Sequence, residues 1–238
     1  MPVEDWNGMA GRIAAIREAI AAAARRAGRD PACVRLLAAT KTVSIERLRA
    51  VTAMGLRLFG ENRVQEALPK LDALASEQIE WHFIGRLQRR KAKSVVGRFT
   101  LIHSVDTVEL AEELERRADA ATCCQEILLE VNVGGEASKG GFSPDEVGRV
   151  LPALARLPHL AVRGLMTIPP PSADPEHTRP AFRSLRKLAQ ELDQLGMDRM
   201  TFRELSMGMS NDFAVAVEEG ATIVRIGTGI FGARPENG

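Results

Sequence analysis

A lysine stands at the end of the first strongly apolar stretch of the 238-residue chain. Residues 36–39 (Leu-Leu-Ala-Ala) are typical of a buried strand, which leads through Thr40 into Lys41. A lysine at such a position commonly extends its ammonium group to water. However, only six of the 32 basic residues are lysines, and only Lys41 ends an apolar strand. A desolvated lysine amine is nucleophilic and forms Schiff bases with aldehydes, so the sequence favours this chemistry at Lys41.

Two glycine-containing segments near the C-terminus are suited to binding a phosphate group. Residues 206–210 (Ser-Met-Gly-Met-Ser) lie between a predicted strand and a predicted helix, and residues 225–229 (Arg-Ile-Gly-Thr-Gly) end the last predicted strand. Glycines let the backbone approach a ligand closely, and amides and hydroxyls at such turns bind phosphate. Together with a lysine of Schiff-base type, they suggest a phosphorylated aldehyde, and pyridoxal 5′-phosphate fits that description.

The elements that must position these groups alternate regularly along the chain. The apolar, β-branched segments predict eight strands: Val34–Lys41, Leu56–Asn62, Glu80–Gly85, Thr100–Asp106, Ile127–Val133, Val162–Ile168, Arg203–Gly208 and Ile223–Ile230. Amphipathic segments predict helices over Val3–Ala27, Ser44–Met54, Arg63–Ala75, Leu87–Val96, Val108–Ala121, Pro144–Leu157, His177–Leu195 and Asn211–Glu219. This alternation predicts an α/β fold, a single (β/α)8 TIM-type barrel domain over residues 1–238 with an additional N-terminal helix.

An open doubly wound sheet is the alternative fold. It would need a glycine-rich fingerprint after the first strand, where residues 40–43 read Thr-Lys-Thr-Val instead. In a barrel, the carboxyl ends of the strands carry the reacting groups. The candidates at these ends are Lys41, Asn62, Gly85, Ser104, Asp106, Asn132, Met166, Thr167, Ser206, Gly208, Arg225 and Gly227. Asn62 and Asp106 also have a simpler structural interpretation as caps of the helices that follow them.

Composition narrows the classes of partner. The net charge is +1, which favours neither nucleic acid nor a membrane surface as the main partner. We expect a cytoplasmic protein, because the N-terminus does not resemble a signal peptide and no stretch is apolar enough to span a membrane. The three cysteines fit reduced thiols, and the four histidines lack metal-ligand spacing, so we expect no metal.

Several motifs in one order resemble a known family. They are residues 38–42 (Ala-Ala-Thr-Lys-Thr), 59–62 (Phe-Gly-Glu-Asn), 81–85 (Trp-His-Phe-Ile-Gly), 164–166 (Gly-Leu-Met), 205–210 (Leu-Ser-Met-Gly-Met-Ser) and 224–228 (Val-Arg-Ile-Gly-Thr). From the leading helix to Gly232 the chain resembles the pyridoxal-phosphate-binding homeostasis proteins, which look like the barrel domain of alanine racemase without its second domain.

The resemblance implies a role for each matched residue. Lys41 would carry pyridoxal phosphate as an internal aldimine. Phosphate contacts would come from Ser206, Gly208, Gly227 and Thr228, while Asn62, Met166 and Met209 would line the pocket. Arg225 would face the pyridine nitrogen in place of a carboxylate. Because a guanidinium cannot supply a proton to that nitrogen, the ring would be a weak electron sink.

Two function classes share this cofactor. A racemase needs a second acid/base on the other face of the cofactor, a tyrosine in the racemases that the chain resembles, and this chain has no tyrosine. His82 or His103 is the substitute to consider. We therefore expect a protein that binds pyridoxal phosphate and takes part in its homeostasis and delivery to apo-enzymes, with an amino acid racemase as the alternative. A class-I aldolase that uses the same lysine without a cofactor is a third class.

Two further features carry weaker hypotheses. Lys139, in a glycine-rich loop, is a candidate for a second, transient aldehyde site or a solvated loop residue. The basic run formed by Arg86, Arg89, Arg90, Lys91 and Lys93 is either a solvated helix face or an attractor for an anionic ligand. We expect a monomer.

Overall fold

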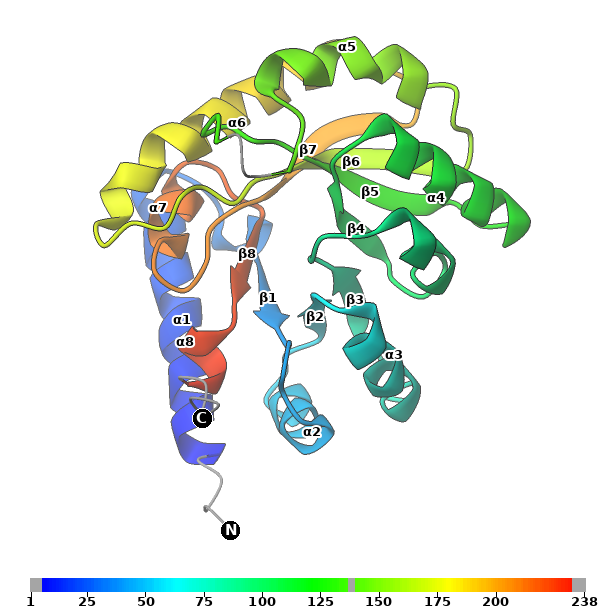
Figure 1. Ribbon diagram of the computed structural model, residues 1–238. Helices are drawn as coiled ribbons and strands as arrows, with labels where there is room; N and C mark the ends of the chain where they lie inside the picture. The colour runs from blue at the N-terminus through cyan, green and yellow to red at the C-terminus, as the bar shows by residue number, and fades with distance from the viewer. Residues whose placement is uncertain (1–5, 137–139, 233–238) are drawn as a thin grey trace.

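The computed structural model describes residues 6–136 and 140–232. Eight parallel strands pair in sequence order, and the last pairs with the first to close a barrel (Figure 1). The strands are β1 (Arg35–Ala39), β2 (Leu58–Glu61), β3 (Glu80–Phe83), β4 (Leu101–Val105), β5 (Gln125–Glu130), β6 (Leu160–Met166), β7 (Met200–Ser206) and β8 (Ile223–Ile226). The predicted (β/α)8 barrel is confirmed.

Helical crossovers surround the sheet (Figure 1). The α-helices are α1 (Trp6–Arg26), α2 (Ile45–Ala53), α3 (Val64–Ala73), α4 (Val108–Ala120), α5 (Pro144–Leu154), α6 (Arg179–Asp193), α7 (Phe213–Glu218) and α8 (Thr228–Phe231). Three short 3₁₀ segments are η1 (Pro31–Cys33), η2 (Arg89–Ser94) and η3 (Pro175–Thr178). In the part of the chain described, no helix is long and apolar enough to cross a membrane.

The strands bury both of their faces. Every second side chain points outward, and those of Leu36, Ala38 and Phe59 pack with the helices in the larger apolar core. The inward side chains form a smaller apolar cluster that includes Leu37 and Met166. The same interior also holds polar and charged side chains. The alternating pattern of the strand sequences does not predict them.

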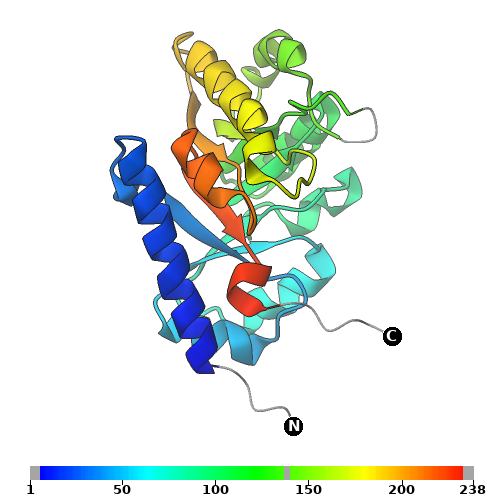
Figure 2. The same ribbon diagram turned by 90° about the vertical axis from the view of Figure 1, so that its left-hand side faces the viewer.

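The N-terminal helix stands where a full eighth helix is missing. Helix α8 has only four residues, and α1 packs against α7 and α8 instead (Figure 2). Buried Ile13, Ile16 and Ile20 form its apolar stripe. Arg12 and Arg47 donate to the carbonyl oxygens of Ile230 at 2.8 Å and Phe231 at 2.6 Å. These contacts fasten the segment after β8 to the helical ring.

The predicted helix Leu87–Val96 is wrong, because only the six-residue 3₁₀ segment η2 forms there. The apolar residues Leu87 and Ala92 are five positions apart and do not share a helix face. The like charges of Arg89 and Lys93 would also repel each other one helical turn apart. The ring of helices is therefore open between α3 and α4.

The predicted strand Ile223–Ile230 is too long, since β8 ends at Ile226 and α8 follows. Gly227 begins the turn into this helix, and its Cβ, if it had one, would lie 3.4 Å from the carbonyl oxygen of Ala39. Because β8 pairs with β1, the segment after β8 lies next to Lys41 and not across the barrel from it.

Candidate functional site

Lys41 lies just beyond the carboxyl end of β1. Ala39 on this strand pairs with Gly60 of β2, so Lys41 and Asn62 leave neighbouring strands at the same level. Lys41 is partly buried, and the next residue, Thr42, has a φ of 63°. The left-handed region is unfavourable for a β-branched residue and is found where the surrounding structure enforces it, often at functional sites.

A buried ion pair fixes the backbone beside Lys41. The Nζ atom of Lys70 donates to Oε1 of Glu61 at 2.7 Å and to the carbonyl oxygen of Thr40 at 2.8 Å. The Thr40 hydroxyl donates to the same carboxylate oxygen at 2.6 Å. Glu61 and Thr40 are fully buried. This cluster joins α3 to β1 and β2 and holds the residue that precedes Lys41.

Asn62 offers a buried acceptor at the mouth of the barrel. Its Oδ1 atom is buried and has no hydrogen-bond partner within the described part of the chain. A Cβ on Gly85 would lie 2.2 Å from the carbonyl oxygen of Asn62, so the next strand end can approach only because residue 85 is glycine. Asn62 does not cap α3, whose N-cap is Arg63 without a side-chain bond. Since buried polar atoms normally have a hydrogen-bond partner, the Oδ1 atom of Asn62 is a candidate acceptor for a donor group of a ligand.

The segments after β7 and β8 form a cluster of small polar groups. The hydroxyl of Thr228 donates to Oγ of Ser210 at 3.1 Å, and the amide of Gly229 donates to the same oxygen at 3.2 Å. Gly208 has a φ of 90°, and a Cβ there would lie 2.5 Å from that of Ala216. Hydroxyls and exposed amides at glycine turns are donors suited to a phosphate group.

Arg225 is buried inside the barrel beneath this cluster. Its Nη1 donates to Oγ of Ser206 at 2.5 Å and its Nη2 to the carbonyl oxygen of Thr167 at 2.9 Å. Burial lowers the pKa of Arg225 to about 10, while the negative charges of Asp212 and Glu130 oppose this shift. The guanidinium therefore stays charged at neutral pH, with its orientation fixed by two acceptors.

Two fully buried histidines adjoin the same serine. Nδ1 of His103 lies 2.9 Å from Oγ of Ser206, and its Nε2 lies 2.9 Å from Nδ1 of His82. Nε2 of His82 lies 2.7 Å from Oε1 of Glu80. Burial lowers the pKa of His82 and lowers that of His103 well below its usual value. Both ring nitrogens of each histidine are therefore engaged in hydrogen bonds inside the barrel.

The predicted site residues fall into two groups. Those at the mouth are Lys41, Asn62, Gly208, Met209, Gly227 and Thr228, and those in or lining the interior are Met166, Ser206 and Arg225. Asp106 does not cap α4, because Thr107 does so by accepting from the amide of Leu110. The candidate Lys139 lies outside the described residues.

The sequence did not reveal the contacts or the burial of several residues in and around the site. Ser210 was expected in a phosphate-binding segment, but the sequence did not show that its hydroxyl contacts Thr228 and Gly229 and so joins the segments after β7 and β8. Lys70, which lies in a predicted helix and in charge-rich surroundings in the sequence, is buried. The spacing of Lys70 with Val64, Ala67 and Leu71 on one helix face was the available signal.

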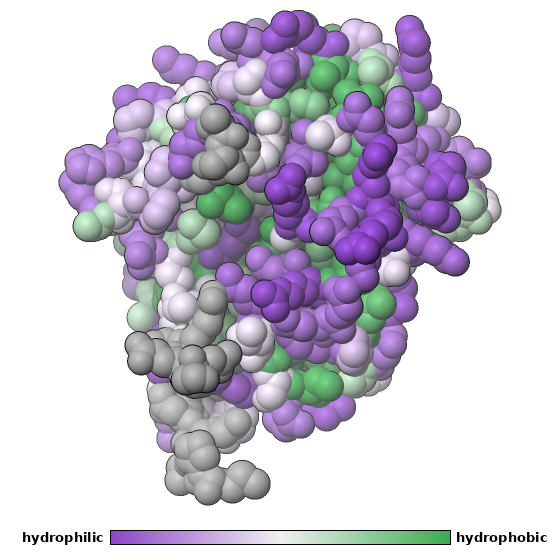
Figure 3. All heavy atoms as spheres, in the orientation of Figure 1, coloured by the Kyte–Doolittle hydropathy of each residue, from purple (hydrophilic) through white to green (hydrophobic). Residues whose placement is uncertain are grey.

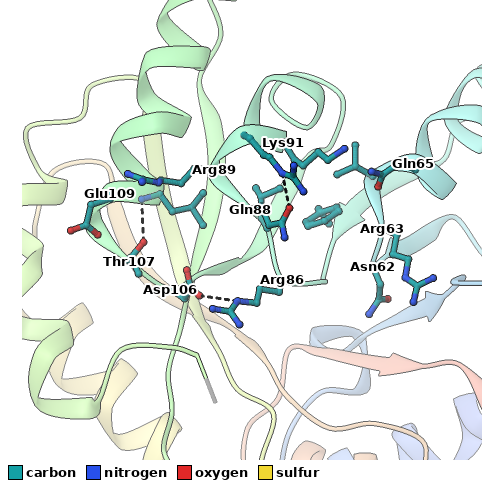
Figure 4. A pocket seen from close by; sticks show the side chains of 15 residues that line it. Asn62, Arg63, Gln65, Arg86, Gln88, Arg89, Lys91, Asp106, Thr107 and Glu109 are labelled. Atoms are coloured by element: carbon teal, nitrogen blue, oxygen red, sulfur yellow. Dashed lines mark hydrogen bonds and ion pairs between the residues drawn. The ribbon is translucent and has the colours of Figure 1, made fainter. Parts of the chain in front are cut away.

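A cationic cavity lies beside the mouth, where η2 leaves the helical ring open. It has a volume of about 970 Å³ and shares Asn62 with the candidate site. Hydrophilic side chains gather over this region in Figure 3. Arg86 is directed toward Asp106, with Asn62 at the other end of the cavity (Figure 4), and the Nε atom of Arg86 lies 4.0 Å from the carboxylate. Four residues of the basic run, Arg86, Arg89, Arg90 and Lys91, line this open cavity, and the first three of them are solvent-exposed.

The residues present fit a phosphorylated aldehyde. The mouth supplies an amine at Lys41, a hydroxyl and amide cluster around Ser210, and an orphaned acceptor at Asn62. Arg225 supplies a fixed positive charge in the interior. The arrangement can bind an aldehyde covalently through the amine and hold an anionic group at the cluster.

Comparisons with known proteins agree with this fit. The alanine racemase N-terminal domain family matches residues 12–235. A "Pyridoxal phosphate homeostasis protein" of Aquifex aeolicus is 49% identical over 223 residues, which cover 94% of this chain and 97% of that protein. A protein of the same name from Pseudomonas aeruginosa is 45% identical over 95% of this chain and 96% of its own length. The structure of PipY from Synechococcus elongatus with pyridoxal phosphate bound superposes with a TM-score of 0.81 at 37% identity, covering 94% of this chain and all of that one.

Proposed function

The chain belongs to the pyridoxal phosphate homeostasis protein family, whose members share the alanine racemase N-terminal domain, and we propose that it binds pyridoxal phosphate covalently at Lys41. The amine of Lys41 condenses with the aldehyde to form a Schiff base and releases one water molecule. The single observation that carries the proposal is the placement of Lys41 between the orphaned acceptor of Asn62 and the hydroxyl and amide cluster after β8.

Each end of the ligand has a complementary group. The phosphate, which needs several donors, would be held by Ser206, Gly208, Gly227 and Thr228, together with Ser210 and the amide of Gly229 that contact Thr228 or each other. Arg225, held by Ser206, would be the group near the ring nitrogen, and its permanently charged guanidinium would not supply a proton there. When bound, the cofactor supplies an electrophilic aldehyde carbon, and this environment favours holding the aldehyde over withdrawing electrons from an attached amino acid.

We infer that the protein stores and delivers the cofactor in the cytoplasm and does not catalyse amino acid chemistry at a substantial rate. The sequence contains no tyrosine to act as the second acid/base of a racemase. His82 and His103, the substitutes considered, have lowered pKa values because of burial, and they contact Glu80 and Ser206 inside the barrel. Because both ring nitrogens of each histidine are already hydrogen-bonded within the barrel, they are poorly suited to exchanging a proton with a substrate.

The experiment compares storage with catalysis in one preparation. The protein loaded with pyridoxal phosphate is mixed first with L-alanine and then with an apo-enzyme that requires the cofactor. We expect activation of the apo-enzyme and no formation of D-alanine above the rate of free pyridoxal phosphate. Racemisation at ordinary enzyme rates would overturn the carrier assignment, and failure to activate any apo-enzyme would overturn delivery. The Lys41→Ala protein, which cannot form the Schiff base, is the matched control.

A further inference from the structure

Five side chains form one continuous series of hydrogen bonds across the barrel interior. Nη1 of Arg225 lies 2.5 Å from Oγ of Ser206, which lies 2.9 Å from Nδ1 of His103. Nε2 of His103 lies 2.9 Å from Nδ1 of His82, whose Nε2 lies 2.7 Å from Oε1 of Glu80. The members come from β8, β7, β4 and β3. The series begins beneath the mouth and ends at the amino end of β3.

The two end residues of the series, Arg225 and Glu80, determine the direction in which its hydrogen bonds are donated. A guanidinium only donates hydrogen bonds, and an ionised carboxylate only accepts them. The hydrogen bond from His82 lowers the pKa of Glu80, helped by Arg35 at 3.0 Å, so the carboxylate is ionised at neutral pH. Nε2 of His82 must therefore carry a proton to approach this oxygen at 2.7 Å.

The remaining donors and acceptors follow from this anchor. A neutral imidazole has one N–H and one bare nitrogen. With Nε2 of His82 protonated, its Nδ1 is bare and accepts from Nε2–H of His103. Nδ1 of His103 is then bare as well and accepts from the hydroxyl of Ser206. The serine oxygen keeps its lone pairs for Arg225, so every bond in the series points from Arg225 toward Glu80.

The charges around the histidines support neutral rings. His82 faces the carboxylates of Glu80 and Glu204 and the guanidinium of Arg35, and burial outweighs the carboxylates in setting its lowered pKa. His103 faces His82 and the cations Arg225 and Arg35, and its pKa is lowered mainly by burial and further by these groups. Both histidines are fully buried. A second proton on His82 would also place an N–H on its Nδ1, opposite the Nε2–H of His103.

We propose that Glu80, His82 and His103 are positioning residues that act through Ser206 to fix the guanidinium of Arg225. Anchored at Glu80, both histidines are held as the Nε2–H tautomer, and the Ser206 hydroxyl is turned away from Arg225. The guanidinium is thereby held between two acceptors, Ser206 and the carbonyl oxygen of Thr167 at 2.9 Å. The effect of a fixed Arg225 on bound pyridoxal phosphate rests on the proposed function. The histidine tautomers are a property of the protein alone and do not depend on it.

The first test reads the tautomers directly in the protein without cofactor. Long-range ¹H–¹⁵N correlation spectra distinguish protonated from bare ring nitrogens, and His82→Asn and His103→Asn proteins assign the signals. We expect both rings to be neutral, with hydrogen on Nε2, from pH 8 down to pH 6. An Nδ1–H tautomer or an imidazolium at either residue in this range overturns the proposal.

The second test uses two matched carboxylates. Glu80 and Glu204 both contact Arg35, at 3.0 Å and 3.4 Å, but only Glu80 accepts from His82. Glu80→Gln removes the anchor of the series, so we expect a shifted absorbance maximum of bound pyridoxal phosphate and a changed pH midpoint of that band. Glu204→Gln should match the parent protein. Equal behaviour of the two variants overturns the positioning role.

The two proposals fail separately. If the cofactor is attached to Lys41 but the histidine tautomers differ from Nε2–H, only the positioning role is wrong. If the tautomers are as expected but no cofactor is attached to Lys41, the proposed function is wrong and the orientation of Arg225 serves another ligand. The spectra of the parent protein decide the tautomers even where a variant fails to fold.

Discussion

The Nζ atom of Lys70 lies 2.7 Å from Oε1 of Glu61, and this buried ion pair stands immediately behind the strand end that carries Lys41. Lys70 also donates to the carbonyl oxygen of Thr40, the residue before Lys41. Lys70 and Lys41 therefore have different roles at the same end of the barrel. Lys70 makes structural contacts only, whereas Lys41 lies at the carboxyl end of β1 and is the amine that we propose binds the cofactor.

Removing Lys70 should destabilise the fold. Lys70→Met leaves the buried carboxylate of Glu61 without its cation, which costs about 3–5 kcal/mol of the free energy of unfolding. Urea denaturation measures this loss. Lys187→Met, at an exposed position on α6, is the control and should change the free energy of unfolding by less than about 0.5 kcal/mol. The double variant Glu61→Gln with Lys70→Met should recover part of the loss, because no isolated charge remains. Equal stability of the two single variants would contradict this account.

Removing one hydroxyl of the cluster after β8 should weaken phosphate binding selectively. Thr228→Val keeps the shape of the side chain but loses the donor that now bonds Ser210. A hydrogen bond to a charged group contributes about 1.5–3 kcal/mol, so the affinity for pyridoxal phosphate should fall roughly 10- to 100-fold. Pyridoxal, which lacks the phosphate, should bind the parent and the variant equally. An equal loss for both ligands would place Thr228 away from the phosphate.

The buried histidines should make stability depend on pH. The pKa values of His82 and His103 are lowered in the folded protein, so below the unfolded value of about 6.5 the unfolded chain binds more protons and is favoured. The contribution of the two histidines to the free energy of unfolding is fully present above that pH and decreases as the pH falls. Between pH 6.5 and 5.5 the pair should lower the free energy of unfolding by at most about 2 kcal/mol, the limit for two groups that stay unprotonated in the folded protein.

The comparison that isolates this effect is between the parent and the His82→Asn, His103→Asn double variant. Burial raises the pKa values of Asp106, Glu130 and Asp212 in both proteins, so their opposing contribution cancels in the difference. The parent should lose stability more steeply than the variant over this range. Parallel pH profiles would contradict the assignment of neutral histidines.

The sequence predicted the barrel, because the alternation of strands and helices is a local pattern. The alternation of strands and helices revealed the eightfold arrangement, and the glycine-containing segments marked the turns after β7 and β8. Ser44 caps α2 and Ser143 begins α5 in a capping box, as their positions indicated. Errors arose where apolar residues lost their helical spacing, as in η2, or where Gly227 ended a β-branched run.

The polar interior could not be predicted, because its partners are far apart in the chain. His103 and Ser206 are separated by 103 positions, and they meet only when the barrel closes. An isolated histidine on a strand is usually a structural residue, and nothing in its neighbours indicates the acceptor that it faces. Likewise, the ion pair between Lys70 and Glu61 depends on the packing of α3 over β2.

The attachment of the cofactor to Lys41 is tested most directly by reducing the loaded protein with borohydride and mapping the label. After loading with pyridoxal phosphate, reduction and proteolysis, mass spectrometry should find the phosphopyridoxyl group on the peptide that contains Lys41. The Lys41→Ala protein should lack both the visible absorbance band and the label, while Lys187→Ala should keep both. A label on another lysine of the parent, or a visible band that survives in the Lys41→Ala protein, would contradict the account.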